Sequence, residues 1–289
     1  SKANPLKSKK VGLMSINVMV NGIPGNMGIT VAKTALARGF NLIPFSLTGE
    51  MIVENEYDLD SLKIELLKPS NREEKIASIL ADYPQLICVD YTHPSAVNQN
   101  AEFYVKHGIP FVMGTTGGDR EALTALVSKH KHPSVIAPNM AKQIVAFQAM
   151  IEYLASEFPS AFDGYKLSVV ESHQKTKADT SGTAKAVVGS FQKMGFSFSE
   201  SDIELVRNEP EQINRMQVPE AYLSGHAFHT YSLDSQDQSV HFEFQHNICG
   251  RHVYAEGTMD AVLFLSERIH AGKPDTYNMM DVLRSGKMG

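Results

Sequence analysis

The sequence predicts an α/β protein with a doubly wound parallel sheet, followed by a second α+β domain that carries a mixed or antiparallel sheet. Up to residue 139, short β-branched runs alternate with amphipathic stretches of helical period, a pattern typical of parallel strands joined by helices. After residue 140, a long helical stretch is followed by segments that alternate between apolar and polar residues. The length of 289 residues fits two ordinary domains.

The first domain is expected to begin with a buried strand over residues 11–20, a glycine turn over 21–28 and a helix over 29–38. A strand over 40–47 completes a βαβ unit, which implies parallel strands and a right-handed crossover. Asn71 to Glu74 fits a capping box before the next helix. The alternation then predicts strands over 86–89, 109–113 and 134–137, and helices over 95–107 and 119–129.

The second domain is expected to begin with a long helix over 141–158 and to contain three antiparallel strands with one solvent-exposed face. Its other elements are a strand over 167–170, a helix over 183–194, the three strands over 226–231, 239–245 and 252–257, and a helix over 258–270. We therefore expect a dinucleotide-binding domain over 1–139, a substrate-binding and oligomerisation domain over 140–257, and a C-terminal segment, 258–289, that packs on the first domain.

Composition narrows the class of protein. Apolar residues make up 43% of the chain and charged residues 20%, and the formal net charge is −5. This balance gives no basic surface for nucleic acid, and no apolar run reaches the ~18 residues that a membrane span requires. Cys88 lies in an apolar run, where a buried thiol is expected, and it is far from Cys249 in sequence. Residues 1–10 do not form a signal peptide and are expected to be a disordered start or the remnant of a removed targeting segment.

The glycine turn predicts a Rossmann-like nucleotide site. Gly22, Gly25 and Gly28 allow a sharp turn from strand to helix and a close approach of the backbone to a pyrophosphate, while Pro24 occupies the usual place of a glycine. The alternative is an ordinary strand-to-helix turn. The strand that follows the first helix ends near Ser46 and Thr48, whose hydroxyls could bind a 2′-phosphate. Glu50 lies slightly late for the acid that contacts a ribose 2′-OH, so NADPH is favoured and NADH remains possible.

Residues 171–184 are the stretch with the most chemistry. His173 could deliver a proton near neutral pH, and Lys177 could pair with a carboxylate or assist the transfer. Ser181, Gly182 and Thr183 would cap the next helix and direct N–H groups at an anion. The alternative is a solvated loop with a serine cap. The other histidines, expected mostly on the surface or in cross-strand pairs and not spaced as a metal site, are His226, His229, His241, His246 and His252.

These motifs together resemble the 4-hydroxy-tetrahydrodipicolinate reductases, also called dihydrodipicolinate reductases, from Val18 to Leu283. The resemblance rests on residues 22–28, 89–94, 114–117, 137–139, 171–184 and 277–283. It implies a homo-oligomer, a dimer or tetramer, that uses NADPH or NADH to reduce a cyclic dicarboxylate in the diaminopimelate route of lysine biosynthesis. Neither a metal, a nucleic acid nor a membrane is implied.

The resemblance also assigns residues. The cofactor-binding set, with the two hydroxyl residues above and Thr92 beside the nicotinamide, is Gly22, Ile23, Pro24, Gly25, Asn26, Met27, Ser46, Thr48, Thr92, Gly114, Thr115, Thr116, Ala137, Pro138, Asn139 and Met140. His173 falls on the general acid and Lys177 on the catalytic lysine. The substrate-binding set is Gln174, Lys177, Ser181, Gly182, Thr183 and Arg251.

One departure from the bacterial pattern is informative. Bacterial members usually carry a second histidine where this chain has Gln174, which can donate a hydrogen bond to a carboxylate but cannot carry charge. Together with the Gly-Ile-Pro-Gly turn, this departure resembles the plant-type branch. That branch implies the chloroplast stroma, with the transit peptide absent from this chain, and otherwise the cytoplasm. Two alternatives remain: another nicotinamide-dependent oxidoreductase of this architecture, acting on a semialdehyde or amino acid, and a non-catalytic NAD(P)-binding sensor.

Overall fold

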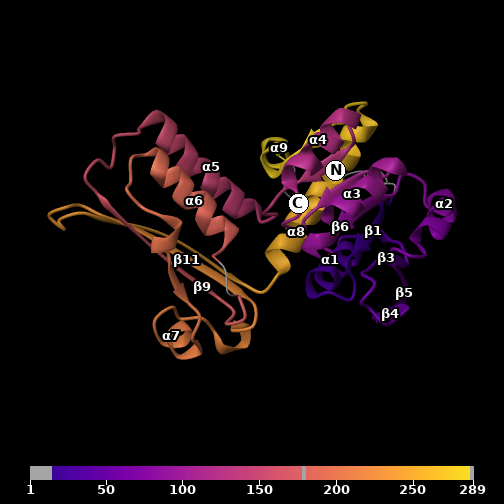
Figure 1. The fold of residues 1–289 in the computed structure, drawn as a ribbon, viewed down its shortest axis with the longest axis horizontal. Helices are drawn as coiled ribbons and strands as arrows, with labels where there is room; N and C mark the ends of the chain where they lie inside the picture. Colours follow the sequence, from indigo (N-terminus) through magenta and orange to yellow (C-terminus); the bar gives the residue numbers. More distant parts are fainter. Residues whose placement is uncertain (1–14, 178–179, 287–289) are drawn as a thin grey trace, which may run out of the picture. The chain divides into compact units, whose positions relative to one another are not determined.

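The structure, a computed structural model of the chain, describes residues 15–177 and 180–286. Residues 1–10, and the start of the strand expected from residue 11, lie outside this range. The chain divides into two compact units, drawn in Figure 1. The first unit comprises residues 1–135 and 262–276, and the second comprises residues 136–261 and 277–289.

The first unit is built on a six-stranded sheet in the order β13-β8-β7-β6-β1-β2. Its strands are β1 (Asn17–Asn21), β2 (Asn41–Leu42), β6 (Ile87–Asp90), β7 (Phe111–Met113), β8 (Ser134–Ile136) and β13 (Thr276–Tyr277). The pairs β1–β2, β1–β6 and β6–β7 are parallel. From β1 the chain proceeds to β2 on one side and later to β6 on the other, so the strand order reverses between β1 and β6. This is the switch point at which doubly wound sheets bind ligands, and the predicted fold class is confirmed.

The helices of the first unit follow the predicted alternation closely. They are α1 (Asn26–Ala37), α2 (Arg72–Asp82), α3 (Val97–Lys106), which follows a 3₁₀ turn over Pro94–Ala96, and α4 (Arg120–His130). Asp119 caps α4 by accepting a hydrogen bond from the Ala122 N–H at 3.0 Å. The capping box predicted at α2 is wrong, because the Asn71 side chain accepts no capping hydrogen bond.

The strand predicted over 40–47 is two strands that belong to different sheets. Pro44 lies between β2 and β3 (Phe45–Leu47), and a proline has no N–H to continue a ladder. The carbonyl of Pro44 instead accepts a hydrogen bond from Glu65, where the second sheet begins. That sheet, in the order β3-β5-β4, adds β4 (Glu56–Leu59) and β5 (Leu62–Leu67), which the sequence analysis did not identify.

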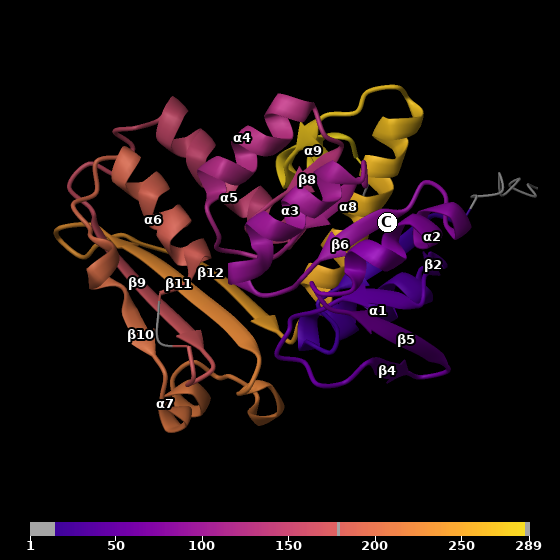
Figure 2. The same ribbon diagram turned by 45° about the vertical axis from the view of Figure 1, so that its right-hand side comes forward.

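The second unit contains a four-stranded sheet in the order β10-β9-β11-β12. Its strands are β9 (Lys166–His173), β10 (Glu204–Val206), β11 (His226–Asp234) and β12 (His241–Cys249), with η2 (Glu200–Asp202), α7 (Glu209–Asn214) and η3 (Glu220–Tyr222) between β9 and β11. Strand β11 pairs antiparallel with both β9 and β12, whereas β10 is parallel to β9. Figure 2 shows α5 (Lys142–Glu157) and α6 (Gly182–Lys193) on one face of this sheet.

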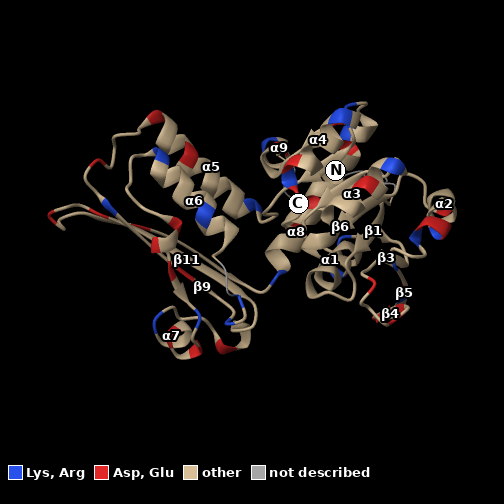
Figure 3. Ribbon diagram, in the orientation of Figure 1, with Lys and Arg blue, Asp and Glu red and all other residues tan. Residues whose placement is uncertain are grey.

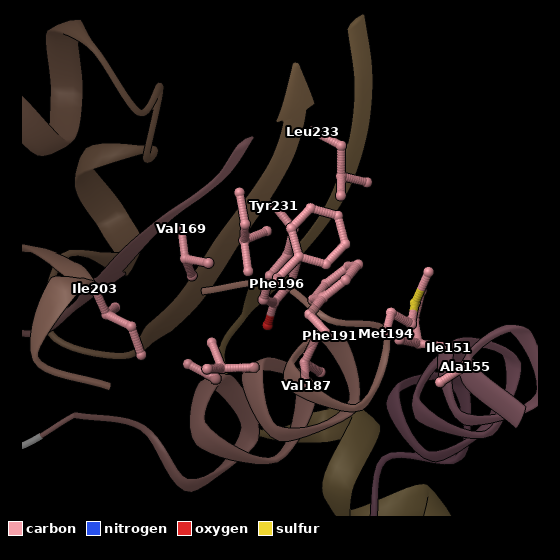
Figure 4. Close-up of a cluster of buried hydrophobic side chains, with 13 residues drawn as sticks. Ile151, Ala155, Val169, Val187, Phe191, Met194, Phe196, Ile203, Tyr231 and Leu233 are labelled. Atoms are coloured by element: carbon pink, nitrogen blue, oxygen red, sulfur yellow. The ribbon is translucent and has the colours of Figure 1, made fainter. Parts of the chain in front are cut away.

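The core of the second unit lies between that sheet face and the two helices. Figure 4 shows Ile151 of α5 and Phe191 of α6 facing Val169 of β9 and Tyr231 and Leu233 of β11. These side chains are at most 5% exposed. Burial of such side chains contributes roughly 1.5–3 kcal/mol each. The core therefore fixes the register of β9 and β11, and with it the polar residues that continue along the same sheet face.

One predicted strand, over 252–257, is wrong. These residues form the first turns of α8 (His252–His270). Ala255, Met259 and Val262 are fully buried at spacings of four and three residues, which is the period of a helix face. The polar alternation of His252, Tyr254 and Glu256 concealed that period.

The C-terminal segment also differs from the expectation that residues 258–289 pack on the first domain. Residues 262–276 belong to the first unit, whereas residues 277–289 belong to the second, where α9 (Met279–Arg284) lies against α5. Among the helices that the described ranges contain, none is long and apolar enough to cross a membrane. Figure 3 shows basic and acidic residues interspersed along the helices.

Candidate active site

The glycine turn joins β1 to α1 at the switch point of the first sheet. Gly22 has φ +106°, and a Cβ at this position would lie 2.0 Å from the backbone oxygen of Tyr91. A Cβ on Gly25 would lie 2.7 Å from the oxygen of Gly22. Gly25 is also the N-cap of α1, and with no side chain it leaves the first N–H groups of the helix without a side-chain cap. The turn therefore combines tight backbone packing with free donors suited to a phosphate.

A pocket of about 570 Å³ opens beside this turn. Its lining includes five predicted cofactor residues, namely Gly22, Pro24, Gly25, Thr48 and Thr92. It also includes Glu50, whose carboxylate accepts a hydrogen bond from the Ser70 N–H at 2.9 Å. Ser46 does not reach the pocket, because it is fully buried and its hydroxyl accepts a hydrogen bond from the Ile23 N–H at 3.2 Å. The sequence predicted that Ser46 contacts a 2′-phosphate. In the structure, Ser46 instead supports the turn from within the protein.

Thr92 and Thr115 contact a buried carboxylate, Asp90, at the end of β6. The hydroxyls of Thr92 and Thr115 each donate to Asp90 Oδ1 at 2.7 Å, and the Tyr104 hydroxyl donates to Oδ2 at 2.6 Å. Thr115 is therefore held by Asp90, while the neighbouring Thr116 is exposed. Gly114 packs on the Tyr91 ring, where a Cβ would lie 2.2 Å from the nearest ring atom.

The predicted residues Ala137 to Met140 belong to the second unit. There the Asn139 side-chain amide donates to the Thr183 hydroxyl at 3.0 Å and its carbonyl oxygen accepts from the Ala141 N–H at 2.8 Å. A residue assigned to the cofactor and a residue assigned to the substrate are thus hydrogen-bonded. Thr183 lies at the start of α6, and the predicted cap is confirmed because Ser181 Oγ accepts a hydrogen bond from the Thr183 N–H at 3.1 Å.

Glu171 is the centre of a buried polar cluster in the second unit. Its side chain is fully buried, and one carboxylate oxygen lies 2.5 Å from an Arg207 guanidinium nitrogen. The Ser181 N–H donates to the other oxygen at 3.1 Å, which ties β9 to the start of α6. Burial acts to raise the pKa of Glu171, but hydrogen bonds from His229 and Arg207 outweigh it and lower that pKa to about 2. Glu171 is therefore an ionised group, neutralised by Arg207.

Two histidines adjoin this carboxylate. The Nε2 atoms of His173 and His229 lie 3.4 Å apart, and they lie 3.9 and 3.6 Å from Glu171 Oε2. The strand register explains the arrangement, because Glu171 is directly opposite His229, which is opposite His246, and His173 follows two residues later on the same face of β9. We call Glu171, His173, Arg207 and His229 the Glu171 cluster.

The expectation that the strand histidines lie mostly at the surface or in cross-strand pairs is met by His229 through its cross-strand neighbours, Glu171 and His246. His229 is 2% exposed and His226 is 4% exposed, because both belong to β11, an inner strand of the sheet. His226 is bonded to Ser172 at 2.7 Å and to the Tyr222 carbonyl at 3.0 Å. His246 is half-buried and stacks on His229, His241 is largely exposed, and His252 is helical.

The pKa of His173 differs from that of a solvent-exposed histidine, which titrates near neutral pH. Burial lowers the pKa of its imidazole well below the usual value, the charge of His229 adds to the effect, and Glu171 opposes it only partly. A histidine in this state is neutral near pH 7, so it is not an imidazolium that gives up a proton unaided.

The composition of the Glu171 cluster also suits a metal. One ligand atom each from Glu171, His173 and His229 lies within 4.8 Å of the others. The guanidinium of Arg207, however, already supplies positive charge beside the carboxylate, and a divalent cation would be repelled by it. The charge of the carboxylate is therefore already balanced, and a divalent cation is disfavoured.

The other predicted residues surround this cluster. Gln174 to Lys177 form a turn after β9, closed by the Lys177 N–H and the Gln174 carbonyl at 2.9 Å. Arg207 Nε donates to the Lys177 carbonyl at 2.8 Å, so one arginine holds both Glu171 and the turn. Arg251 lies before α8 with its guanidinium against Gly225. A cavity of about 50 Å³ is lined by His173, Ser181, Thr183, Asn139, His229, His246, Ile144, Ala227, Ile248 and Tyr254.

Sequence reasoning missed several members of these sites. Glu171 and His173 are two residues apart, so they share one face of a strand. The predicted strand ended at Val170, and extending it by three residues would have placed both side chains on that face. His229 and Arg207 could not have been found, because only the pairing register of β9, β10 and β11 brings them to Glu171. Asp90 directly follows a buried strand, so its position at the switch point was available from the sequence.

A glycine turn at the switch point of a doubly wound sheet, combined with a second unit that holds buried ionisable groups at a helix start, defines an oxidoreductase that uses a nicotinamide dinucleotide. Comparison with known families makes this specific. The family description "Dihydrodipicolinate reductase, N-terminus" matches residues 16–140, and "Dihydrodipicolinate reductase, C-terminus" matches residues 143–283. The chain belongs to the dihydrodipicolinate reductase family, as its motifs suggested.

Named relatives agree with this assignment. The chain is 51% identical over 274 residues to 4-hydroxy-tetrahydrodipicolinate reductase 2, chloroplastic, of Arabidopsis thaliana, covering 94% of this chain and 78% of that protein. It is 50% identical over 275 residues to a probable chloroplastic reductase 1 of Oryza sativa subsp. japonica, covering 95% and 80%. A dipicolinate-bound dihydrodipicolinate reductase from Paenisporosarcina sp. TG-14 has the same fold, with a TM-score of 0.64 at 20% identity over 92% of this chain and 98% of that one.

Proposed function

We propose that the protein reduces 4-hydroxy-tetrahydrodipicolinate to tetrahydrodipicolinate with a reduced nicotinamide dinucleotide, in the diaminopimelate route of lysine biosynthesis. The observation that carries the proposal is the Glu171 cluster, set against the capped start of α6 in a chain of this family. A semialdehyde dehydrogenase requires a reactive thiol in its site. Cys88 is buried, which raises the pKa of its thiol, and Cys249 is exposed at the end of β12 and lines neither of the two cavities described above.

The residues of the first unit fit a dinucleotide. A Cβ on Gly22 or Gly25 would clash with the neighbouring backbone, so these glycines permit the tight turn that would direct the start of α1 at a pyrophosphate. The first N–H groups of α1 would bind that pyrophosphate, and the neighbouring pocket would hold the adjacent ribose. When bound, the dinucleotide supplies a hydride to the substrate. Thr92, Gly114, Thr115 and Thr116 would stand near the nicotinamide.

The second unit supplies the groups for a dicarboxylate. The Gly182 N–H and the Thr183 hydroxyl, at the start of α6, would bind one substrate carboxylate, and Lys177 would neutralise it. Gln174 and Arg251 remain candidates for the second carboxylate. After the conjugated C=C–C=N system accepts a hydride, negative charge develops on the ring, and His173 would supply the proton to carbon.

Glu50 bears on the choice of dinucleotide. Of the two hydroxyls that favoured NADPH, Ser46 is buried beneath the turn, whereas Glu50 lines the pocket. A carboxylate there suits a free ribose 2′-OH and repels a 2′-phosphate. We therefore expect NADH to be used at least as readily as NADPH. Glu50→Gln should raise the preference for NADPH over NADH about tenfold, measured as a ratio of kcat/KM values, and Glu54→Gln, outside the pocket lining, serves as the control.

The sheet edge and the relatives support two further proposals. In the sheet of the described residues, β12 is the last strand, nine residues long, and its own Phe242 is 44% exposed. An open edge of this length favours pairing with a second copy, as a dimer or tetramer, which light scattering after size exclusion would measure. The chloroplastic plant relatives support a chloroplast location, in the stroma.

The test of the reaction is direct. Absorbance of the reduced dinucleotide is followed with freshly generated 4-hydroxy-tetrahydrodipicolinate, and with an aldehyde and an amino acid as alternative substrates. Turnover of the cyclic dicarboxylate alone supports the proposal, and its absence at any dinucleotide concentration refutes it. His173→Ala should lower kcat by ~10²–10⁴-fold without changing dinucleotide affinity, and Lys177→Ala should impair both kcat and substrate KM.

A further inference from the structure

His173 presents a difficulty for the proposed proton transfer. Its environment keeps the imidazole neutral, since burial lowers its pKa and the positive charges of His229, Arg207 and Lys177 act in the same direction. A neutral imidazole can give up an N–H proton readily only if its other nitrogen receives one at the same time, because the alternative is a bare imidazolate. The source of that second proton must therefore touch the His173 ring.

The structure supplies a partner at the required distance. Nε2 of His173 lies within hydrogen-bond distance of Nε2 of His229, at 3.4 Å, with the ring centroids 5.0 Å apart. His229 is 2% exposed, and it adjoins the ionised Glu171 at 3.6 Å, which can stabilise a positive charge on it. Both histidines line the small cavity that also contains Ser181 and Thr183.

We infer that His229 is a positioning residue that passes a proton through His173 to the substrate. It compensates for the second histidine of the bacterial pattern, which is Gln174 in this chain. This inference rests on the proposed function. In the resting pair, imidazolium His229 shares its Nε2–H between Glu171 Oε2, 3.6 Å away, and Nε2 of His173, 3.4 Å away, and Glu171 is the counter-charge. His173 therefore carries its own proton on Nδ1.

The transfer balances in atoms and charge. After the substrate ring has taken up a hydride, its carbanion carbon forms a C–H bond as the Nδ1–H bond of His173 breaks. The Nε2–H bond of His229 breaks as Nε2 of His173 gains that proton, so both rings end neutral. The negative charge of Glu171 is then balanced by Arg207, 2.5 Å away. Before the next cycle, solvent protonates Nδ1 of His173 as the proton on its Nε2 returns to Nε2 of His229, which restores the resting pair.

Charged and titratable groups face His229 from several elements. Glu171 and His173 face it from β9, His246 stacks on it from β12 at 4.7 Å, and Tyr231 stacks from its own strand at 6.4 Å. Arg207 and Lys177 act through Glu171 and the turn, and Tyr254 lines the same cavity from α8. Only the protonated pair is active, so kcat should fall about tenfold per pH unit above the apparent pKa of the pair.

The experiment compares His229→Gln with the wild type and with His226→Gln. Glutamine keeps a hydrogen-bonding side chain but carries no proton. We expect kcat to fall ~10²-fold, the decline at high pH to disappear, and the KM for the dicarboxylate to change little. His226 is a buried histidine of the same strand with separate partners, so His226→Gln should retain the wild-type pH profile. An unchanged kcat and pH profile in His229→Gln would overturn the inference.

A second measurement needs neither the variant nor turnover. Nitrogen-15 spectra of histidine-labelled wild-type protein report which ring nitrogen of His173 carries the proton. Protonation on Nδ1, with Nε2 accepting, supports the relay, and protonation on Nε2 overturns it. If the wild type does not reduce the dicarboxylate but shows this tautomer, the proposed function fails while the histidine pair stands.

Discussion

The two candidate sites differ in the kind of residue that forms them: glycines in the first unit and buried ionisable side chains in the second. The first-unit site relies on missing side chains, since Gly22 and Gly25 let the turn pack directly against the backbone of Tyr91 and of Gly22. The second-unit site relies on side chains that are costly to bury, with Glu171 and two histidines almost without solvent. The first can be damaged by adding one methyl group, and the second by removing one charge. This difference decides how each site fails when it is altered.

The largest effect is expected from Gly22→Ala. The new Cβ would lie 2.0 Å from the Tyr91 oxygen, at a φ of +106° that residues with a side chain rarely adopt. The Tyr91 oxygen belongs to the backbone, so it cannot move aside as the end of a flexible side chain could. We expect a loss of about 3 kcal/mol or more in the stability of the first unit and no measurable dinucleotide binding. Calorimetry and nucleotide titration would measure both. Gly39→Ala, also at positive φ but with no atom within 4 Å, should cost less and leave binding intact.

Arg207→Met should have the next largest effect. It leaves the buried Glu171 carboxylate without its cation, and breaking a buried pair in this way costs about 3–5 kcal/mol. The double variant Glu171→Leu, Arg207→Met should recover part of the stability, because no buried charge is left, while activity stays lost. Urea unfolding of the four proteins in this cycle measures the coupling. Additive effects of the two changes would contradict the view that the charges form one unit.

Acid should destabilise the second unit at mild pH. Burial lowers the pKa of His173, His226 and His246 below the usual value, to about 3 for His246. The unfolded chain therefore binds more protons than the folded one between about pH 6.5 and 3, so this stability is complete above pH 6.5 and is lost as the pH falls. Each such histidine contributes a slope of up to about 1.4 kcal/mol per pH unit.

Urea unfolding at pH 7.5 and 5.5 would show this slope, and His246→Phe should reduce it. Glu171, whose pKa is lowered to about 2, contributes a loss only at lower pH, roughly between 4.5 and 2. A midpoint that is the same at both pH values would show that protonation of these rings is not coupled to unfolding.

The same contrast explains what could be predicted. The first sheet, its glycine turn and the polar residues at its strand ends follow from local periodicity, because each strand–turn–helix unit is short and continuous. The second-unit site is non-local. His229 and Arg207 meet Glu171 through strand pairing across 58 and 36 residues, and nothing in the local sequence specifies that register. The helix at 252–270 was missed at its start for a related reason, since six residues of polar alternation fit either a strand or a helix.

Ser46→Ala should have the smallest effect, and it tests whether a residue of the first-unit site supports the turn or contacts the ligand. This residue looked like a ligand contact from the sequence, but its hydroxyl accepts the buried Ile23 N–H and supports the turn from below. Ser46→Ala leaves that N–H without its partner and should cost about 1–3 kcal/mol of stability. The ratio of NADPH to NADH affinity should not change. Thr48→Val, at the lining of the pocket, should instead weaken binding with little cost in stability, and the reverse pattern would return Ser46 to the ligand-binding surface.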